Sequence, residues 1–83
     1  MNKISVLAID LGGESGRVIK MDFDGVKFYL EEIHRFPNLS VEASGTTYWD
    51  VLSLLREIQS GIAKSSSVNS LGVDSWGVDF ALL

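Results

Sequence analysis

The most constraining feature of the sequence is a short apolar run near its start, which ends in an aspartate and a glycine-rich turn. Residues 4 to 9 are apolar except for Ser5, and such a run is typical of a central β-strand that is covered on both faces. Asp10 and Leu11 end the run, and three glycines lie within residues 12 to 16. The chain therefore leaves a buried strand through a turn whose backbone a ligand can approach closely.

Two further strands are predicted after this turn. Residues 17 to 23 alternate between apolar and other residues, which is typical of a strand with one buried face. Asp24-Gly25 is typical of a two-residue hairpin turn, and a third strand follows from Val26. Its alternation changes phase at Glu31-Glu32, which predicts a β-bulge there. On the second strand, the residues expected to be buried are Ile19, Met21 and Phe23.

A loop, a helix and two short strands complete the predicted order. Residues 37 to 47 are rich in Asn, Ser, Gly and Thr, and they predict a loop. Asp50 is expected to cap a helix from Val51 to about Lys64. A strand over residues 71 to 74 and another beginning at Val78 follow. One arc of the helix is apolar and is expected to be core: Val51, Leu52, Leu54, Leu55, Ile58 and Ile62.

The order β-β-β-α-β-β is that of the opening of an α/β domain with a mixed sheet, of the ribonuclease H-like or actin-like ATPase type. The helical crossover is expected to return the fourth strand parallel to the first. At 83 residues the chain makes one small domain at most. Because it stops within the apolar run 80 to 83, we interpret residues 1–83 as the truncated first part of a longer domain.

Charge and composition exclude several classes of function. The net charge is −4 and the seven Lys and Arg residues are scattered, so no basic patch exists to bind a nucleic acid backbone. The absence of cysteine excludes disulfides, thiolate metal ligands and cysteine nucleophiles. The opening apolar run is too short for a signal peptide or a membrane span, so we expect a cytoplasmic protein with no membrane partner.

Asp10 and the glycine-rich turn after it form the first candidate site. A carboxylate at this position can orient a hydrated Mg²⁺ beside nucleotide phosphates, while the backbone N–H groups of residues 12 to 16 bind the phosphates. The Ser15 hydroxyl and Arg17 add further donors. The alternative is a hairpin turn that is glycine-rich for structural reasons alone, and spacing does not separate the two. The turn is not a Walker P-loop, because the lysine and the helix of that motif are missing.

Three other features have a structural interpretation that the sequence favours over a functional one. Gly77, between Trp76 and Asp79, can let a polar ligand lie against the backbone, but a tight turn with a core tryptophan is the simpler reading. His34 has no carboxylate partner that the sequence predicts, and we interpret it as a surface or satisfied histidine. Tyr48 and Trp49 precede the helix and are interpreted as a packing staple.

A nuclease of the ribonuclease H-like type is the alternative within this fold class. Asp10, Glu57 and Asp74 lie on the first strand, the helix and the end of the fourth strand, where such an enzyme places metal-binding carboxylates. Two observations count against it. Glu57 lies on the polar arc of the helix, expected to point away from the sheet, and an acidic surface repels a polynucleotide.

Two segments resemble the FGGY carbohydrate kinase family, an ATP-dependent group within the actin-like superfamily. Residues 10 to 17, DLGGESGR, are shared with many sugar kinases, while residues 72 to 80, GVDSWGVDF, narrow the resemblance to members that phosphorylate L-rhamnulose. Segments 32 to 36 and 49 to 51 match at the same spacing, so the resemblance covers essentially the whole chain. It implies Mg²⁺-dependent transfer of the ATP γ-phosphoryl group to the 1-hydroxyl of L-rhamnulose.

The resemblance also implies roles for individual residues. Asp10 lies near the metal and Gly77 contacts the sugar. The residues that contact ATP are Gly13, Glu14, Ser15, Gly16 and Arg17. Glu14 departs from the small residue expected there, which puts its own role in doubt.

Part of the site that the resemblance implies lies outside this chain, and two alternative functions remain open. The catalytic base and the adenosine pocket lie downstream in the family, so the isolated chain is expected to have no kinase activity. The alternatives are a kinase for another ketose or pentulose, and a non-catalytic actin-like ATPase or assembly module. The Trp76-Gly77 segment favours the kinase.

Overall fold

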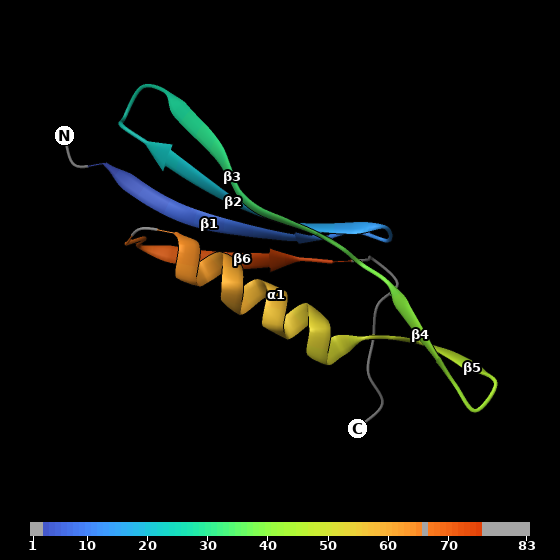
Figure 1. Cartoon of the computed structure of the whole chain (residues 1–83). Coiled ribbons are helices and arrows are strands. Elements are labelled where there is room, and N and C mark those ends of the chain that lie inside the picture. The colour runs from blue at the N-terminus through green and yellow to red at the C-terminus, as the bar shows by residue number, and fades with distance from the viewer. Residues whose placement is uncertain (1–2, 66, 76–83) are drawn as a thin grey trace.

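The computed structural model describes residues 3–65 and 67–75, which form two sheets and one helix (Figure 1). The larger sheet has four strands in the order β3-β2-β1-β6, and the smaller one pairs β4 with β5. The bounds are β1 Ile4–Leu11, β2 Ser15–Phe23, β3 Phe28–Pro37, β4 Ser40–Ala43, β5 Thr46–Trp49, α1 Val51–Lys64 and β6 Ser70–Asp74. No helix within the described ranges is long and apolar enough to cross a membrane.

The α/β class and the mixed sheet are as the sequence predicts, and four of the predicted strands lie in that sheet within the described residues. β1 is a central strand, antiparallel to β2 and parallel to β6, and α1 forms the crossover that returns the chain to β6. The parallel β1–β6 pair places the carboxyl ends of both strands at the same edge of the sheet, with Asp10 directly beside Asp74. The strand predicted from Val78 lies outside the described residues.

Only one face of the sheet is covered by the described part of the chain, which corrects two expectations. α1 lies along that face (Figure 1), and Leu7, Ile9 and Val18 form the buried cluster there. On β1 the opposite face is partly exposed, so the strand is not covered on both faces. On β2 the buried residue is Val18, whereas the predicted apolar set (Ile19, Met21 and Phe23) is only half-buried. The reason is register: Val18 pairs with Ile9 and shares its face.

The connection between β2 and β3 is longer than the predicted two-residue turn. Phe23 pairs with Phe28, which leaves a four-residue loop over 24 to 27. The Asp24 carboxylate accepts hydrogen bonds from the backbone N–H groups of Val26 and Lys27, both at 2.8 Å. This side chain organises the loop by itself, so the chain does not need the positive φ at both central positions that a two-residue turn requires.

The predicted β-bulge is present on β3, one residue beyond its expected place. Ile19 pairs with Glu32 and Val18 pairs with His34, so Ile33 is the extra residue. A bulge turns the following side chains to the other face of the strand. Here it brings His34 and Phe36 to the side of the sheet that α1 covers, as their contacts below show.

The segment predicted as a loop over 37 to 47 contains a hairpin. β4 and β5 pair antiparallel from Ser40↔Trp49 to Ala43↔Thr46. Ser44 and Gly45 between them have φ values of 52° and 77°, the pair of positive angles that the tightest hairpin turn requires. A Ser-Gly pair before the β-branched and aromatic run 46 to 49 was the signal for this hairpin.

α1 has the predicted bounds and cap, because the Asp50 carboxylate accepts a hydrogen bond from the Ser53 N–H at 3.1 Å. The expectation that its whole apolar arc is core is wrong. Leu54 is buried, but Val51 and Leu52 are 66% and 78% exposed. The helix approaches the sheet instead at Gly61, where an added Cβ would lie 2.4 Å from a methyl carbon of Val18. A glycine at this position lets the two backbones come close. The buried residues of the helix are therefore Leu54 and Gly61 rather than the whole apolar arc.

Candidate functional site

Asp10 and Arg17, two of the predicted site residues, form an ion pair across the β1–β2 ladder. Both side chains are partly open to solvent, at 37% and 40% exposure. Because paired residues share a face, Asp10, Arg17 and Asp74 project from the side of the sheet opposite α1. The structure therefore places two carboxylates and one guanidinium together at the carboxyl edge of β1 and β6.

The donor set at this edge fits a magnesium ion that a nucleotide brings with it. Mg²⁺ is usually held by one or two carboxylates together with substrate phosphates, while the rest of its ligands are water. Asp10 and Asp74 supply two carboxylates on neighbouring strands. No cluster of three or more His, Cys, Asp or Glu side chains suited to a metal occurs within residues 3–65 and 67–75, so a site made entirely of protein ligands is not formed there.

The glycine-rich turn is shorter than the sequence suggests. Residues 12 to 14 connect the strands, and Ser15 and Gly16 already belong to β2. The Gly12 N–H donates to the Ser15 carbonyl at 2.9 Å, so it is not available to a phosphate. Gly13 and Glu14 are exposed, and their backbone N–H groups have no protein acceptor among the described residues. These two groups and the Arg17 guanidinium remain as candidate anion donors.

Gly12 and Gly16 are glycines for steric reasons that the sequence did not reveal. A Cβ on Gly12 would lie 2.9 Å from the Ser15 carbonyl oxygen, so a side chain would open the turn. A Cβ on Gly16 would lie 2.2 Å from the Phe36 ring. Gly16 is itself buried, and the ring of Phe36 occupies the space that a side chain would need. Gly16 is therefore required for the Phe36 ring to pack against the end of the turn.

Asn38, which sequence reasoning missed, is the residue that ties this turn to the rest of the fold. Its backbone N–H donates to the Glu14 carbonyl at 2.9 Å, and its side-chain Nδ2 donates to the Gly12 carbonyl at 2.8 Å. Asn38 is only 6% exposed. Its Oδ1 atom is buried and has no hydrogen-bond partner among the described residues. An asparagine within a predicted loop gave no signal of this role.

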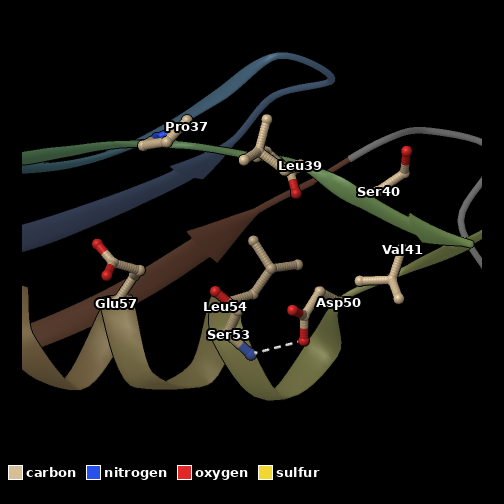
Figure 2. Close-up of a pocket in the computed structure, with 9 residues that line it drawn as sticks. Pro37, Leu39, Ser40, Val41, Asp50, Ser53, Leu54 and Glu57 are labelled. Atoms are coloured by element: carbon tan, nitrogen blue, oxygen red, sulfur yellow. Dashed lines mark hydrogen bonds between the residues drawn. The ribbon is translucent and has the colours of Figure 1, made fainter.

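Two cavities meet at Asn38. One, of about 340 Å³, lies between the first turns of α1 and the segment from Pro37 to Val41 (Figure 2). The two carboxylates in its lining are already bonded, since Asp50 caps the helix and Glu57 is bonded to His34. The other, of about 390 Å³, lies beside Gly13 and is lined by Gly13, Asn38, Ser40, Thr47, Tyr48 and Trp49.

The two aromatic residues at this second cavity do not form the predicted packing staple. Tyr48 and Trp49 are 53% and 45% exposed. Their place on β5, in a hairpin that projects from one end of the molecule (Figure 1), keeps them from closing over the helix. Both rings instead line the cavity beside the glycine turn.

His34 is satisfied, as the sequence interpretation holds, and its partner corrects the expectation for Glu57. The Glu57 carboxylate lies 2.8 Å from His34 Nε2, and Lys64 Nζ lies 2.8 Å from His34 Nδ1. An ammonium group can only donate, so His34 Nδ1 accepts from Lys64, and the protonated Nε2 donates a hydrogen bond to the Glu57 carboxylate. Glu57 therefore points toward β3 rather than away from the sheet.

This contact also excludes the three-carboxylate nuclease site within the described chain. Asp10 and Asp74 are neighbours, but Glu57 is bonded to His34 on the face that α1 covers. Asp10 projects from the opposite face, so the three carboxylates do not converge. Gly77, the predicted sugar contact, lies outside the described residues, as do Trp76 and Asp79.

The chain is similar in sequence to several known proteins. No protein-family model matches the chain. A rhamnulokinase of Bacteroides thetaiotaomicron is 45% identical over 98% of this chain. One of Mannheimia succiniciproducens is 42% identical over 100% of this chain. A rhamnulokinase of Halalkalibacterium halodurans is 43% identical over 93% of the chain. The chain spans 17–18% of the length of these relatives. The resemblance indicated by the sequence motifs is thus confirmed at the level of rhamnulokinases, to which this chain is similar over nearly all of its own length.

Proposed function

We propose that this chain is part of an ATP-dependent sugar kinase whose intact form phosphorylates L-rhamnulose at the 1-hydroxyl. The observation that carries the proposal is the 40–45% identity to rhamnulokinases over 93–100% of the chain. The Asp10–Arg17 pair beside an exposed glycine turn supports it, because phosphoryl transfer depends on charge neutralisation and positioning.

In this proposal, each of the described site residues has its own role in binding the phosphates. Arg17 and the N–H groups of Gly13 and Glu14 bind phosphate oxygens of ATP, and the Ser15 hydroxyl is a further donor. Asp10, with Asp74 beside it, would hold a hydrated Mg²⁺, which when bound would supply neutralisation of phosphate charge. Arg17 orients the Asp10 carboxylate through their ion pair. Gly16 acts indirectly, because it admits the Phe36 ring beneath the turn.

The place of the chain in the intact protein is a further part of the proposal. Residues 1–83 form the first portion of an actin-like domain of the FGGY type, and Gly77 contacts the sugar. The catalytic base and the adenosine pocket belong to other parts of the intact, cytoplasmic enzyme. The 83-residue chain alone therefore has no kinase activity. Sugar-dependent turnover by that chain, purified free of other kinases, would contradict this point.

The test is ADP release by the intact protein, coupled to NADH oxidation, with Mg-ATP and a panel of ketoses. The panel contains L-rhamnulose, L-fuculose and D-xylulose. A clear preference for L-rhamnulose is the expected result. Preference for another ketose would retain the phosphate site and refute the specificity. ATP hydrolysis that no sugar stimulates would refute the kinase and leave a non-catalytic actin-like ATPase or assembly module.

A further inference from the structure

Asn38 contacts the glycine turn at two points, and both contacts are made to backbone carbonyl groups. Its own N–H donates to the Glu14 carbonyl at 2.9 Å and its side-chain Nδ2 donates to the Gly12 carbonyl at 2.8 Å. Pro37, which precedes it, is the last residue of β3. Asn38, directly after β3, therefore holds the turn through the carbonyl groups of its first and last residues.

Peptide geometry turns these two contacts into a constraint on the N–H groups. In a trans peptide the C=O of one residue and the N–H of the next point in opposite directions, and no described peptide bond is cis. With the Gly12 carbonyl held toward Asn38, the Gly13 N–H must point away from Asn38. The Glu14 carbonyl imposes the same direction on the Ser15 N–H. Asn38 thus selects one orientation of a turn that its glycines would otherwise leave free to flip.

The unsatisfied oxygen of Asn38 sets a cost against the stability that its two hydrogen bonds provide. Its Oδ1 atom is buried without a partner in the described part of the chain, and a buried acceptor in that state costs free energy. An apolar side chain of similar size would avoid that cost, but it would leave the Gly12 carbonyl without the Nδ2 donor. Asn38 is therefore most simply explained by what its amide donor does for the Gly12 carbonyl.

We propose that Asn38 is a positioning residue that orients the Gly12–Glu14 turn so that the Gly13 N–H faces the phosphates of ATP. The proposal rests on the proposed function, since it assigns Asn38 to the ATP side of that reaction. Asn38 itself touches neither phosphate nor sugar. Its loss is therefore expected to impair the use of ATP and to leave the use of the sugar nearly unchanged.

The experiment compares Asn38→Leu and Asn38→Ala with Asn69→Ala in the intact protein. Asn69 is a matched control, because it also makes two hydrogen bonds to one residue, Ser5, at the other end of β1. Its backbone N–H donates to the Ser5 carbonyl at 2.7 Å, and its Oδ1 accepts from the Ser5 N–H at 2.8 Å. The KM for Mg-ATP, the KM for L-rhamnulose and the thermal midpoint are measured for each variant. Asn38→Asp, which keeps the shape but loses the Nδ2 donor, replaces Asn38→Leu if the latter does not fold.

The expected result is a KM for Mg-ATP raised about tenfold in both Asn38 variants. The KM for the sugar should change less than about twofold, and the thermal midpoint of Asn38→Leu should fall no further than that of Asn69→Ala. Asn69→Ala should lower the midpoint without changing either KM. The inference is overturned if the Asn38 variants leave the KM for Mg-ATP unchanged, or raise both KM values together as the midpoint falls. A wild-type protein that binds no ATP would instead overturn the proposed function, and this inference with it.

Discussion

The two ends of β1 carry the same kinds of polar group, namely an aspartate, a basic side chain and an asparagine. At the amino end, Lys3 lies 3.7 Å from Asp22, and the Ser5 hydroxyl donates to Asp22 at 2.5 Å. Asn69 closes this end through its two hydrogen bonds with Ser5. At the carboxyl end, the corresponding groups are the Asp10–Arg17 pair and Asn38.

The difference between the ends lies in what remains unpaired. Ser5, Asp22 and Asn69 satisfy one another at the amino end. At the carboxyl end, the exposed N–H groups of the turn and the buried Asn38 Oδ1 have no partner in the described part of the chain. A buried group without a partner costs a fold free energy, so in the proposed function we assign stability to the amino end and binding to the carboxyl end.

The largest expected effect comes from removing the basic residue at the carboxyl end, with the basic residue at the amino end as the control. Arg17→Ala in the intact protein should lower kcat/KM for Mg-ATP about 100-fold, since it removes a charged donor from the developing phosphate charge. Lys3→Ala, which breaks the ion pair with Asp22 at the other end, should change kcat/KM less than about twofold. Steady-state kinetics at saturating sugar measure both values.

The thermal midpoint separates this effect from a loss of fold. An ion pair as exposed as Asp10–Arg17 contributes about 1 kcal/mol or less to stability, so Arg17→Ala should unfold within a few degrees of the wild type. Equal losses of activity in the Arg17 and Lys3 variants would remove the functional difference between the two ends of β1.

The second effect tests whether the carboxyl end depends on the packing beneath it. Gly16→Ala should lower the free energy of unfolding by about 1–3 kcal/mol, because its Cβ would overlap the buried Phe36 ring. Gly72→Ala on β6 is the control, since nothing lies within 4 Å of its Cβ, and it should change stability by about 0.5 kcal/mol or less. Urea unfolding of the intact protein, followed by tryptophan fluorescence, measures both.

A compensating substitution makes this prediction specific. Phe36→Leu removes part of the ring that the new methyl group meets, so the double variant Gly16→Ala/Phe36→Leu should cost less than the sum of the two single changes. Simple additivity would show that Gly16 and Phe36 do not share the space that the structure assigns to them.

The sequence predicts the parts of this molecule that depend on local patterns. The Asp50 cap and the helix from Val51 to Lys64 are confirmed, because caps and helical periodicity are local. The parallel β6 is confirmed as well, although it pairs Val6 with Ser70, because a helical crossover has a strongly preferred geometry. The cross-strand pairing of Asp10 with Arg17 follows from a short turn between two antiparallel strands. The cap, the helix and this turn are each determined by residues that are close together in the chain.

The features that the sequence did not predict depend on contacts between distant residues. Asn38 reaches the glycine turn across 26 positions, and Glu57 reaches His34 across 23. The buried face of β2 was assigned wrongly because it depends on which side of the sheet receives α1. The hairpin over 40 to 49 is the exception, because its Ser-Gly turn was a local signal that went unused.

The smallest expected effect concerns the carboxylate at the amino end. The pKa of Asp22 lies below its ordinary value of 3.8, chiefly because the Ser5 hydroxyl donates to it, with smaller contributions from the charges of Lys3 and Lys20. A lowered pKa means that the folded state favours the charged form. The stabilisation is therefore fully present above pH 3.8 and is lost as the pH falls below that value through the folded pKa.

Ser5→Ala should accordingly raise the pKa of Asp22 toward 3.8, as measured by NMR titration of the carboxyl carbon between pH 2 and about 6. Asp24 provides the internal control, because its pKa is lowered by the backbone N–H groups of Lys27 and Val26, which Ser5→Ala leaves in place. The KM for Mg-ATP should not change, since Ser5 lies at the end of β1 that serves stability. A parallel shift of Asp24 would point to general loosening of the sheet, and a raised KM would show that the two ends of β1 are coupled through the strand.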